Sequence, residues 1–414
     1  MVDLQAWEEA LRRAVLCAGA DILSELLSTI GCGRRGEAVV CDCSHRMTSQ
    51  GVRTKTIRTI LGPVRFSRSL FRCSACGHYS FPADLLLNVE RTGFSPGLRR
   101  FMARAGSRTS FADAEEDLRV YAGVNVDRRD IERVAEQVGQ QVESWMVREN
   151  RSCQQCACGD ADDIPMFYIS LDGTGIPVRK SEVEGRRGKA EDGKAKTREV
   201  KLGCVFTQAK VDDKGYAVRD EGSTSYVGAI EHAKLFGQRL RFEAVRRGYH
   251  RARQVVAISD GAAYNKTIIQ EQFPRATHII DLYHAREHLH KLMKALAVES
   301  DEQSKWLKDL DRGHIRTIIT RAHSRPCPET AVETLRIETE YFAKNANSMR
   351  YQKFRNRGYF VGSGVIEAGC RTLVGQRLKK SGMFWSVAGA NAILALRCCE
   401  FSGRFDDFWE SLTN

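Results

Sequence analysis

Two short apolar runs, each leading into an aspartate, constrain the fold of this chain more than any other feature of its sequence. FYISL precedes Asp172 and VVAIS precedes Asp260. Each run has the length of a buried strand, so its carboxylate is expected at the carboxyl end of that strand, where open α/β sheets bind ligands. A third run, THII, leads into Asp281. The segment from Val255 to Asp281 therefore predicts a strand, helix and strand in a right-handed crossover.

A further acid, Glu367, lies at the start of a helical pattern in GSGVIEAG. Carboxylates gathered from distant segments can hold two divalent cations about 4 Å apart, an arrangement suited to in-line phosphoryl transfer. For any single acid a plainer reading stays open, because Asp-Gly is a common turn signal and an acid after a strand often caps the next helix. The joint pattern of Asp172, Asp260 and Glu367 favours a metal site.

Five segments follow one another in an order that resembles a known family. They are LDGTG, AKTREVKLGCVFTQ, SDGAAYNKTI, DLYHAREHL and GSGVIEAGCRTLVGQRLKKSGMFW. This order resembles bacterial insertion-sequence transposases of the ISKra group and, more distantly, the Mutator and hAT transposases. The resemblance implies an α/β, RNase H-like catalytic domain of the DDE type in which Asp172, Asp260 and Glu367 bind two Mg²⁺ or Mn²⁺ ions. It also implies that Asp281 and His284 match an Asp/Cys-x-x-His motif, and we expect these two residues behind the metal ligands or near the DNA.

The overall charge agrees with a nucleic-acid partner. The chain has 64 Lys and Arg against 52 Asp and Glu, a net charge of +12, and such a balance favours polyanions. No apolar run approaches the roughly 20 residues of a membrane span, and no secretory pattern opens the sequence. We therefore expect a cytoplasmic, nucleoid-associated protein that acts on double-stranded DNA and has no membrane partner.

Four cysteines predict a structural zinc ion. Cys73 and Cys76 form a Cys-x-x-Cys knuckle, and Cys41 and Cys43 lie about thirty residues earlier, a pattern typical of zinc ligands in a cytosolic protein. The intervening VRTKTIRTILGPVRFSRSLFR alternates basic and apolar residues, which indicates a two-stranded ribbon. The relatives usually have Cys-x-x-Cys at the first knuckle, so His45 could replace one of its thiolates here. Ordinary unligated thiols are the alternative.

Other cysteines carry less information. Cys153, Cys156 and Cys158 fall in the polar stretch RENRSCQQCACGDADD. No fourth ligand is evident nearby, so we interpret this stretch as a linker, although the spacing permits a second zinc site.

The first thirty residues predict one amphipathic helix over positions 3–30. Apolar residues recur there at helical spacing, namely Leu4, Trp7, Leu11, Val15, Ile22 and Leu26. Core packing or self-association explains such a stripe better than a cofactor site.

A helix-turn-helix arrangement is expected behind the ribbon. Two helical patterns are separated by Ala122-Gly123-Val124, and Asp127 is suited to cap the second helix. That helix carries three arginines that could contact DNA, Arg128, Arg129 and Arg133. Acids are interspersed among them, so a plain helical bundle remains an alternative to base reading.

Basic residues in the second half of the chain predict further DNA contacts. Residues 178–201 form a charged segment next to Asp172, and its Arg186, Arg187 and Lys189 are placed to follow phosphates. Four cations come after Glu367 without an intervening acid, Arg371, Arg377, Lys379 and Lys380. Trp385 could stack on a flipped base, although an aromatic residue after a basic turn is often part of a core.

The predicted organisation has five parts. They are an N-terminal helix (1–35), a zinc-ribbon-like module (36–92), a helical DNA-binding region (93–150), a linker (151–163) and a catalytic domain (164–414) with a helical insertion (285–360). The predicted function is binding of element ends followed by metal-dependent cleavage and strand transfer, by a dimer or higher oligomer that joins two ends. A DNA-binding regulator without chemistry and a nuclease that only cuts are the alternatives.

Overall fold

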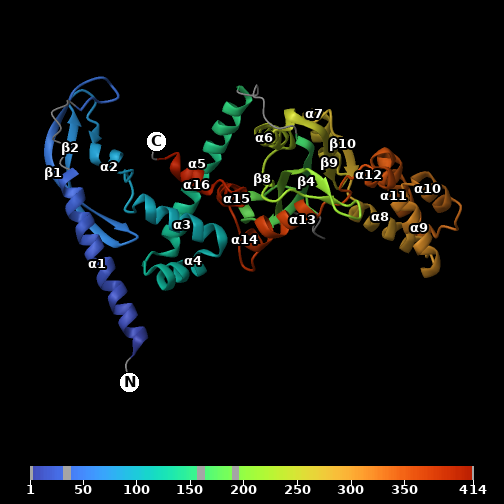
Figure 1. The fold of residues 1–414 in the computed structure, drawn as a ribbon, viewed down its shortest axis with the longest axis horizontal. Helices are drawn as coiled ribbons and strands as arrows, with labels where there is room; N and C mark the ends of the chain where they lie inside the picture. The colour runs from blue at the N-terminus through green and yellow to red at the C-terminus, as the bar shows by residue number, and fades with distance from the viewer. Residues whose placement is uncertain (1–2, 31–38, 156–163, 189–194, 413–414) are drawn as a thin grey trace. The chain divides into compact units, whose positions relative to one another are not determined.

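The computed structural model describes residues 3–30, 39–155, 164–188 and 195–412, with the side chains of residues 30 and 150–155 left out (Figure 1). The chain forms two compact units, residues 1–138 and residues 139–414. The division falls within the long helix α5 (Arg128–Gln155). Each unit has its own sheet, and the two are described in turn.

The first unit contains a three-stranded antiparallel sheet in the order β1-β2-β3. The strands are β1 (Met47–Thr59), β2 (Gly62–Cys73) and β3 (Tyr79–Ser80). The hairpin pairs Thr59 with Gly62, and this tight connection uses the positive φ of +127° at Gly62. Apolar side chains of the ribbon face inward, for example Val64 and Phe66, which are almost fully buried. The ribbon predicted from alternating residues is confirmed.

Helix α1 (Leu4–Ile30) forms where it was predicted, but its apolar stripe does not pack as expected. The six stripe residues from Leu4 to Leu26 are 54–66% exposed. Contact with the sheet comes from the C-terminal half of the helix, through Ala20, Leu23 and Leu27. Core packing is therefore the wrong explanation for the stripe, since the helix extends well beyond the sheet surface that it covers.

The helical part of the first unit follows the sheet. It comprises α2 (Pro82–Leu86), α3 (Pro96–Arg108), α4 (Phe111–Asp117), a π-helical turn (Leu118–Ala122) and the start of α5. The predicted glycine turn is present, with Gly123 at φ +70°. The Asp127 carboxylate accepts a hydrogen bond from the Arg129 N–H at 2.7 Å, as a helix cap does. The first predicted helical pattern is split in two, because Ser110 caps α4 through the Asp113 N–H.

The second unit is built on a five-stranded mixed sheet in the order β10-β9-β4-β5-β8. The strands are β4 (Ile164–Pro177), β5 (Thr197–Gln208), β8 (Ser225–Ala229), β9 (Ala252–Ser259) and β10 (Thr277–Ile280). The first three pair antiparallel, while β9 runs parallel to both β4 and β10. A short hairpin of β6 (Lys210–Val211) and β7 (Ala217–Val218) lies outside this sheet. The apolar runs before Asp172, Asp260 and Asp281 are thus neighbouring parallel strands.

Helices cover both faces of this sheet (Figure 1). On one face, α6 (Ala233–Arg246) and α7 (Ala263–Gln272) share a core with Phe167, Ile169 and Leu171 of β4. The alternating residues of β4 point to the other face, where α13 (Gly364–Gly369) contacts β4 and β5 and α15 (Val387–Phe401) contacts β8. The short α14 (Gln376–Leu378) and α16 (Phe405–Glu410) complete the C-terminal part. Asp172 therefore faces α13, the helix that carries Glu367.

A helical insertion separates β10 from α13. Its helices are α8 (Leu282–Ala295), α9 (Ser300–Arg312), α10 (Ile315–His323), α11 (Val332–Asn345) and α12 (Tyr351–Arg355). These helices span Leu282–Arg355 of the chain, where a helical block was expected over residues 285–360, and the first of them begins directly after the last strand. Trp306 and Phe342 are fully buried within it.

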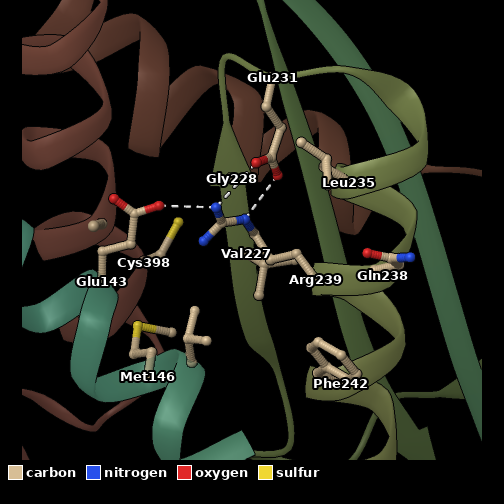
Figure 2. A pocket seen from close by; sticks show the side chains of 12 residues that line it. Glu143, Met146, Val227, Gly228, Glu231, Leu235, Gln238, Arg239, Phe242 and Cys398 are labelled. Carbon is tan, nitrogen blue, oxygen red and sulfur yellow. Dashed lines mark hydrogen bonds and ion pairs between the residues drawn. The ribbon is translucent and has the colours of Figure 1, made fainter. Parts of the chain in front are cut away.

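An ion triad ties the second half of α5 to the sheet (Figure 2). Arg239 of α6 donates hydrogen bonds of 2.8 Å to Glu231 and to Glu143 of α5. The triad borders a cavity of about 150 Å³ whose wall includes Met146 and Phe242. Nearby, α5 crosses α15 so closely that a Cβ on Gly139 would lie 2.2 Å from the Ala392 carbonyl oxygen. The paired charges and the close helix crossing indicate that this region has a structural role, in which α5 packs against α6 and α15.

Candidate functional site

Three aspartates lie side by side at one end of the parallel strands. Leu171 of β4 pairs with Ser259 of β9, and Ser259 pairs with Ile280 of β10. Asp172, Asp260 and Asp281 are the next residues of the three strands. Asp172 lies within β4 and not at its end, because β4 continues to pair with β5 as far as Pro177 after its pairing with β9 has stopped.

Asp172 is half-buried, and two neighbours hold its carboxylate. The Gly173 N–H donates to Oδ1 at 2.7 Å, and the Cys370 thiol forms a second hydrogen bond. Burial raises the pKa of Asp172, and the charge of Asp260 adds to that rise while the hydrogen bonds oppose it. The Asp260 carboxylate is thus close enough for its charge to affect the pKa of Asp172.

Asp260 is oriented by the turn that follows β9. Its Oδ1 accepts hydrogen bonds from the Ala262 N–H and from Asn265 Nδ2, both at 2.9 Å. The turn requires Gly261 at φ +87°. Asn265 is fully buried on α7, so its amide is a rigid support. Within the described chain, Oδ2 of Asp260 has no hydrogen-bond donor and remains available to a ligand.

Asp281 is fully buried and its hydrogen-bonding capacity is used by the protein. Oδ2 accepts from the His284 N–H at 2.9 Å and from His284 Nδ1 at 2.8 Å, while Oδ1 accepts from the Ser363 N–H at 2.8 Å. Burial alone would raise the pKa of Asp281, but these hydrogen bonds lower it. The same contact raises the pKa of His284 to about 9. Asp281 therefore positions His284 and Ser363.

Glu367 is exposed on the first turn of α13. Its Oε1 accepts a hydrogen bond from the Ser363 hydroxyl at 2.5 Å. One ligand atom each from Asp281, His284 and Glu367 lie within 4.8 Å of one another. In the described part of the chain, Asp172 and Asp260 form no such group with Glu367. The charge of His284 nevertheless lowers the pKa of Asp172, and the charge of Asp260 raises that of His284, so His284 is near both sets of acids.

Sequence reasoning missed several residues that build this site. Ser363 links Asp281 to Glu367, Asn265 supports Asp260, and Cys370 contacts Asp172. The signal for Ser363 was its position four residues before Glu367 at a helix start, which is the spacing of one helical turn. Cys370 opens a π-helical turn (Cys370–Gly375), and such turns occur frequently at functional sites.

The cations predicted after Glu367 divide into two groups. Lys379 donates a hydrogen bond of 2.5 Å to the Thr174 hydroxyl on β4, two residues beyond Asp172. Arg371 and Lys379 are exposed, and Lys380 is half-buried. Arg377 and Trp385 are instead buried, at 0% and 6% exposure.

The predicted DNA contacts of Arg377 and Trp385 are corrected accordingly. The Arg377 guanidinium lies 4.9 Å from the centroid of the Trp385 ring. Trp385 Nε1 donates to the Leu378 carbonyl at 3.1 Å. Both side chains pack with each other in the interior, and neither offers a surface to DNA.

A cavity of about 570 Å³ lies on the face of β5 that packs against α6, opposite to the face of Asp172, and its lining is basic overall although it includes Glu199 and Glu231. Arg186 and Arg187 line it together with Arg198, Lys201 and Tyr264. The pKa of Tyr264 is raised by burial and by the charges of Glu199, Asp260 and Asp172, which places Tyr264 near these acids. The predicted contact residue Lys189 lies outside the described residues. In the first unit, Arg128, Arg129 and Arg133 are exposed, and Arg133 pairs with Asp130 at 2.5 Å.

The four predicted zinc ligands come together in the first unit. Ligand atoms of Cys41, Cys43, Cys73 and Cys76 all lie within 4.8 Å of one another, and three of the sulfur pairs are 3.5 Å apart. Four sulfurs around a tetrahedral zinc ion, each at about 2.3 Å, would be separated by about 3.8 Å. Backbone N–H groups of Cys76 and Ala75 lower the pKa of Cys73 to about 6. This Cys₄ cluster could hold zinc.

His45 is not needed to complete the cluster. Its Nδ1 lies 2.9 Å from the Cys43 carbonyl oxygen and is engaged there. The side chain of Cys153 and the residues Cys156 and Cys158 fall outside what the structure describes. Among the described helices, none is long and apolar enough to cross a bilayer.

Comparisons with known proteins give distant similarities. No family model matches the sequence. A curated protein of Streptococcus gallolyticus, described as a UPF0236 protein in the vanSb 3' region, is 20% identical over 370 residues, which cover 87% of this chain and 75% of that protein. Among solved structures, the Drosophila P element transposase strand transfer complex is similar at 12% identity, with 80% of this chain and 84% of that chain covered and a TM-score of 0.26. So low a TM-score describes no close agreement between the two folds as wholes.

Proposed function

We propose that this protein is a DDE-type DNA transposase of the ISKra group whose second unit has an RNase H-like catalytic fold. The observation that carries the proposal is the meeting of acids from three distant segments at one end of the sheet. Asp172 and Asp260 lie on adjacent parallel strands, and Ser363 and Asp281 bring Glu367 toward the same end. The sheet, with three antiparallel strands followed by two parallel ones, supports the fold assignment.

The donor set fits hard divalent cations. Mg²⁺ and Mn²⁺ prefer carboxylate oxygens, and Asp260 and Glu367 each keep one oxygen without a hydrogen-bond donor among the described residues. When bound to Asp172, Asp260 and Glu367, two such ions would activate the attacking hydroxyl and stabilise the leaving oxygen. Asp281 is saturated by hydrogen bonds and is better suited to hold His284 and Ser363 in place.

Cations of this chain are placed to hold the DNA strand at the acids. Lys379 lies beside β4 near Asp172, and Arg186 and Arg187 line the cavity on the α6 side of β5. Guanidinium and ammonium groups fix the register of a phosphate backbone without reading its sequence. We assign recognition of the element ends to the first unit, with Arg128, Arg129 and Arg133 and a zinc-ribbon-like module, and we expect a dimer that joins two ends.

The proposal is tested with purified protein, labelled element ends, a target plasmid and Mg²⁺ or Mn²⁺. Joined products that need the metal are the expected result. DNA that is cut but not joined would identify a nuclease. DNA that is bound by the protein but neither cut nor joined would identify a regulator. Either of these results overturns the proposal.

Ser363→Ala should reduce strand cleavage about 10- to 100-fold, the usual effect of losing a group that orients a metal ligand. The variant keeps the backbone N–H that binds Asp281 and loses only the hydroxyl that holds Glu367. The Mn²⁺ concentration needed for half-maximal cleavage should therefore rise. Ser363→Thr retains a hydroxyl and is the matched control. An unchanged Mn²⁺ requirement in Ser363→Ala would show that Glu367 does not depend on this contact.

A further inference from the structure

A second basic cleft lies at the opposite end of the sheet from the acids. Its volume is about 610 Å³. We call it the arginine cleft, and its walls are formed by Arg253, Gln254, Val255, Arg275, Thr277, Arg357 and Tyr359. Gln254 and Thr277 lie at the beginning of β9 and β10. Asp260 and Asp281 instead follow the last residues of these strands. None of the DNA contacts predicted from the sequence lies in this cleft.

The charge of the arginine cleft is of one sign. Three of its seven lining residues are arginines, and among the residues that the structure describes no acid lines it. A fourth arginine is close, because Arg241 and Arg275 lie 4.2 and 4.9 Å from the centroid of the same Tyr249 ring. Burial and the charges of these two arginines lower the pKa of the adjacent His250. Like charges gathered around a hollow with low-dielectric walls concentrate a positive potential that attracts anions.

Hydrogen bonds fix the positions of several residues that line the arginine cleft. Arg275 Nη2 donates to the Tyr249 carbonyl at 2.7 Å. Gln208 of β5 donates from Nε2 to the Gly358 carbonyl at 3.0 Å, next to Arg357. The Tyr359 hydroxyl is hydrogen-bonded to the Gln254 side chain, and both residues line the cleft. Little order has to be gained when an anion binds, which favours affinity.

We propose that the arginine cleft binds the phosphodiester backbone of duplex DNA. The planar guanidinium presents a fork of N–H donors that matches phosphate oxygens, and three exposed arginines line this cleft. The choice of DNA over other polyanions rests on the proposed function, whereas the charge and shape of the cleft do not depend on it.

The distance to the acids sets a minimum length for DNA that touches both places. Seven residues of strand separate Arg253 from Asp260, which is roughly 23 Å at the usual rise of a parallel strand. Duplex DNA rises about 3.4 Å per base pair. A duplex cut at the acids must therefore extend at least about seven base pairs to reach the cleft, so the cleft holds DNA outside the reacting phosphate.

The test measures duplex DNA binding as a function of salt. Each phosphate contact contributes about 0.9 to the slope of log affinity against log salt, so the double variant Arg275→Ala/Arg357→Ala should lower the slope by about 2. The matched control is Arg336→Ala/Lys344→Ala, which removes two exposed cations of α11 that pair with Glu340. This control loses the same charge but should keep the slope. Thermal unfolding of both variants shows that each is folded.

The outcomes separate this inference from the proposed function. A slope that falls equally in both double variants, or in neither, overturns the cleft as a DNA site. The proposal is also overturned if an acidic peptide or inorganic phosphate competes fully with DNA at equal charge concentration. The cleft would then bind anions without selectivity for DNA. All binding is measured without Mg²⁺, so a protein that never cleaves DNA can still show the slope change. Cleavage with an unchanged slope refutes the cleft alone.

Discussion

Asp172→Asn and Glu367→Gln are each expected to reduce metal-dependent strand cleavage on the order of 10³-fold. Each substitution replaces a negatively charged carboxylate, which would bind the metal ions at the reacting phosphate, with a neutral amide. Both substitutions keep the size and shape of the side chain. DNA binding without metal should stay close to that of the parent protein, since neither residue is a cation. The measurement is the single-turnover cleavage rate of a labelled element end at saturating protein and Mg²⁺.

Two comparisons sharpen this first test. Glu271→Gln removes an exposed acid of α7 and should leave the cleavage rate unchanged. Asp281→Asn distinguishes the two possible ligand sets when Mn²⁺ binding is measured directly by electron paramagnetic resonance. If Asp281→Asn abolishes Mn²⁺ binding while Asp172→Asn leaves it intact, the metal is held by the group of Asp281, His284 and Glu367, and our ligand assignment is refuted. Parental cleavage rates in both Asp172→Asn and Glu367→Gln would refute the site itself.

Cys73→Ser is expected to abolish zinc binding and to unfold the ribbon around it. Cys73 is fully buried and is held within 3.5 Å of the Cys43 sulfur. Structural zinc sites contribute on the order of 10 kcal/mol of apparent binding free energy at neutral pH, far more than a small three-stranded sheet can supply alone. Zinc content per chain should fall from about one ion to none, as measured by mass spectrometry of the metal. Protease cleavage between residues 39 and 80 should appear.

The controls for the zinc prediction are other residues of the same unit. Cys17→Ser changes an exposed cysteine of α1 and should retain zinc. His45→Ala should also retain it, because His45 contacts the Cys43 carbonyl and lies outside the cluster. Loss of zinc from His45→Ala, with zinc retained in Cys43→Ser, would instead support the alternative ligand set. A parent protein that contains no zinc after purification in zinc-supplemented medium would contradict the site.

Local patterns in the sequence predicted much of what the structure contains. The apolar runs before Asp172, Asp260 and Asp281 are strands, because their length and apolar composition can be read without information from elsewhere in the chain. The cysteine spacing predicted the cluster for the same reason, since a knuckle is a local turn. Helix boundaries with a capping residue, such as Asp127 before α5, were also readable.

Partners across long sequence separations could not be read in this way. The arginine cleft gathers residues from β9, β10 and the segment after α12, and its positive character exists only after these have been folded together. Periodicity also says nothing about which apolar face is covered. The stripe of α1 has a correct helical pattern and still remains exposed.

By itself, the sequence determined the strands, the acids that follow their apolar runs, the cysteine knuckles and the excess of positive charge, because each depends on neighbours along the chain. Only the tertiary structure decided that Ser363 links Asp281 to Glu367, that Arg377 and Trp385 are buried, and that His284 lies among the acids. Hydrogen bonds and burial of this kind depend on distance in space, and a side chain's surroundings are set by the packing of elements as much as 205 residues apart, as in the contact of Lys379 with Thr174.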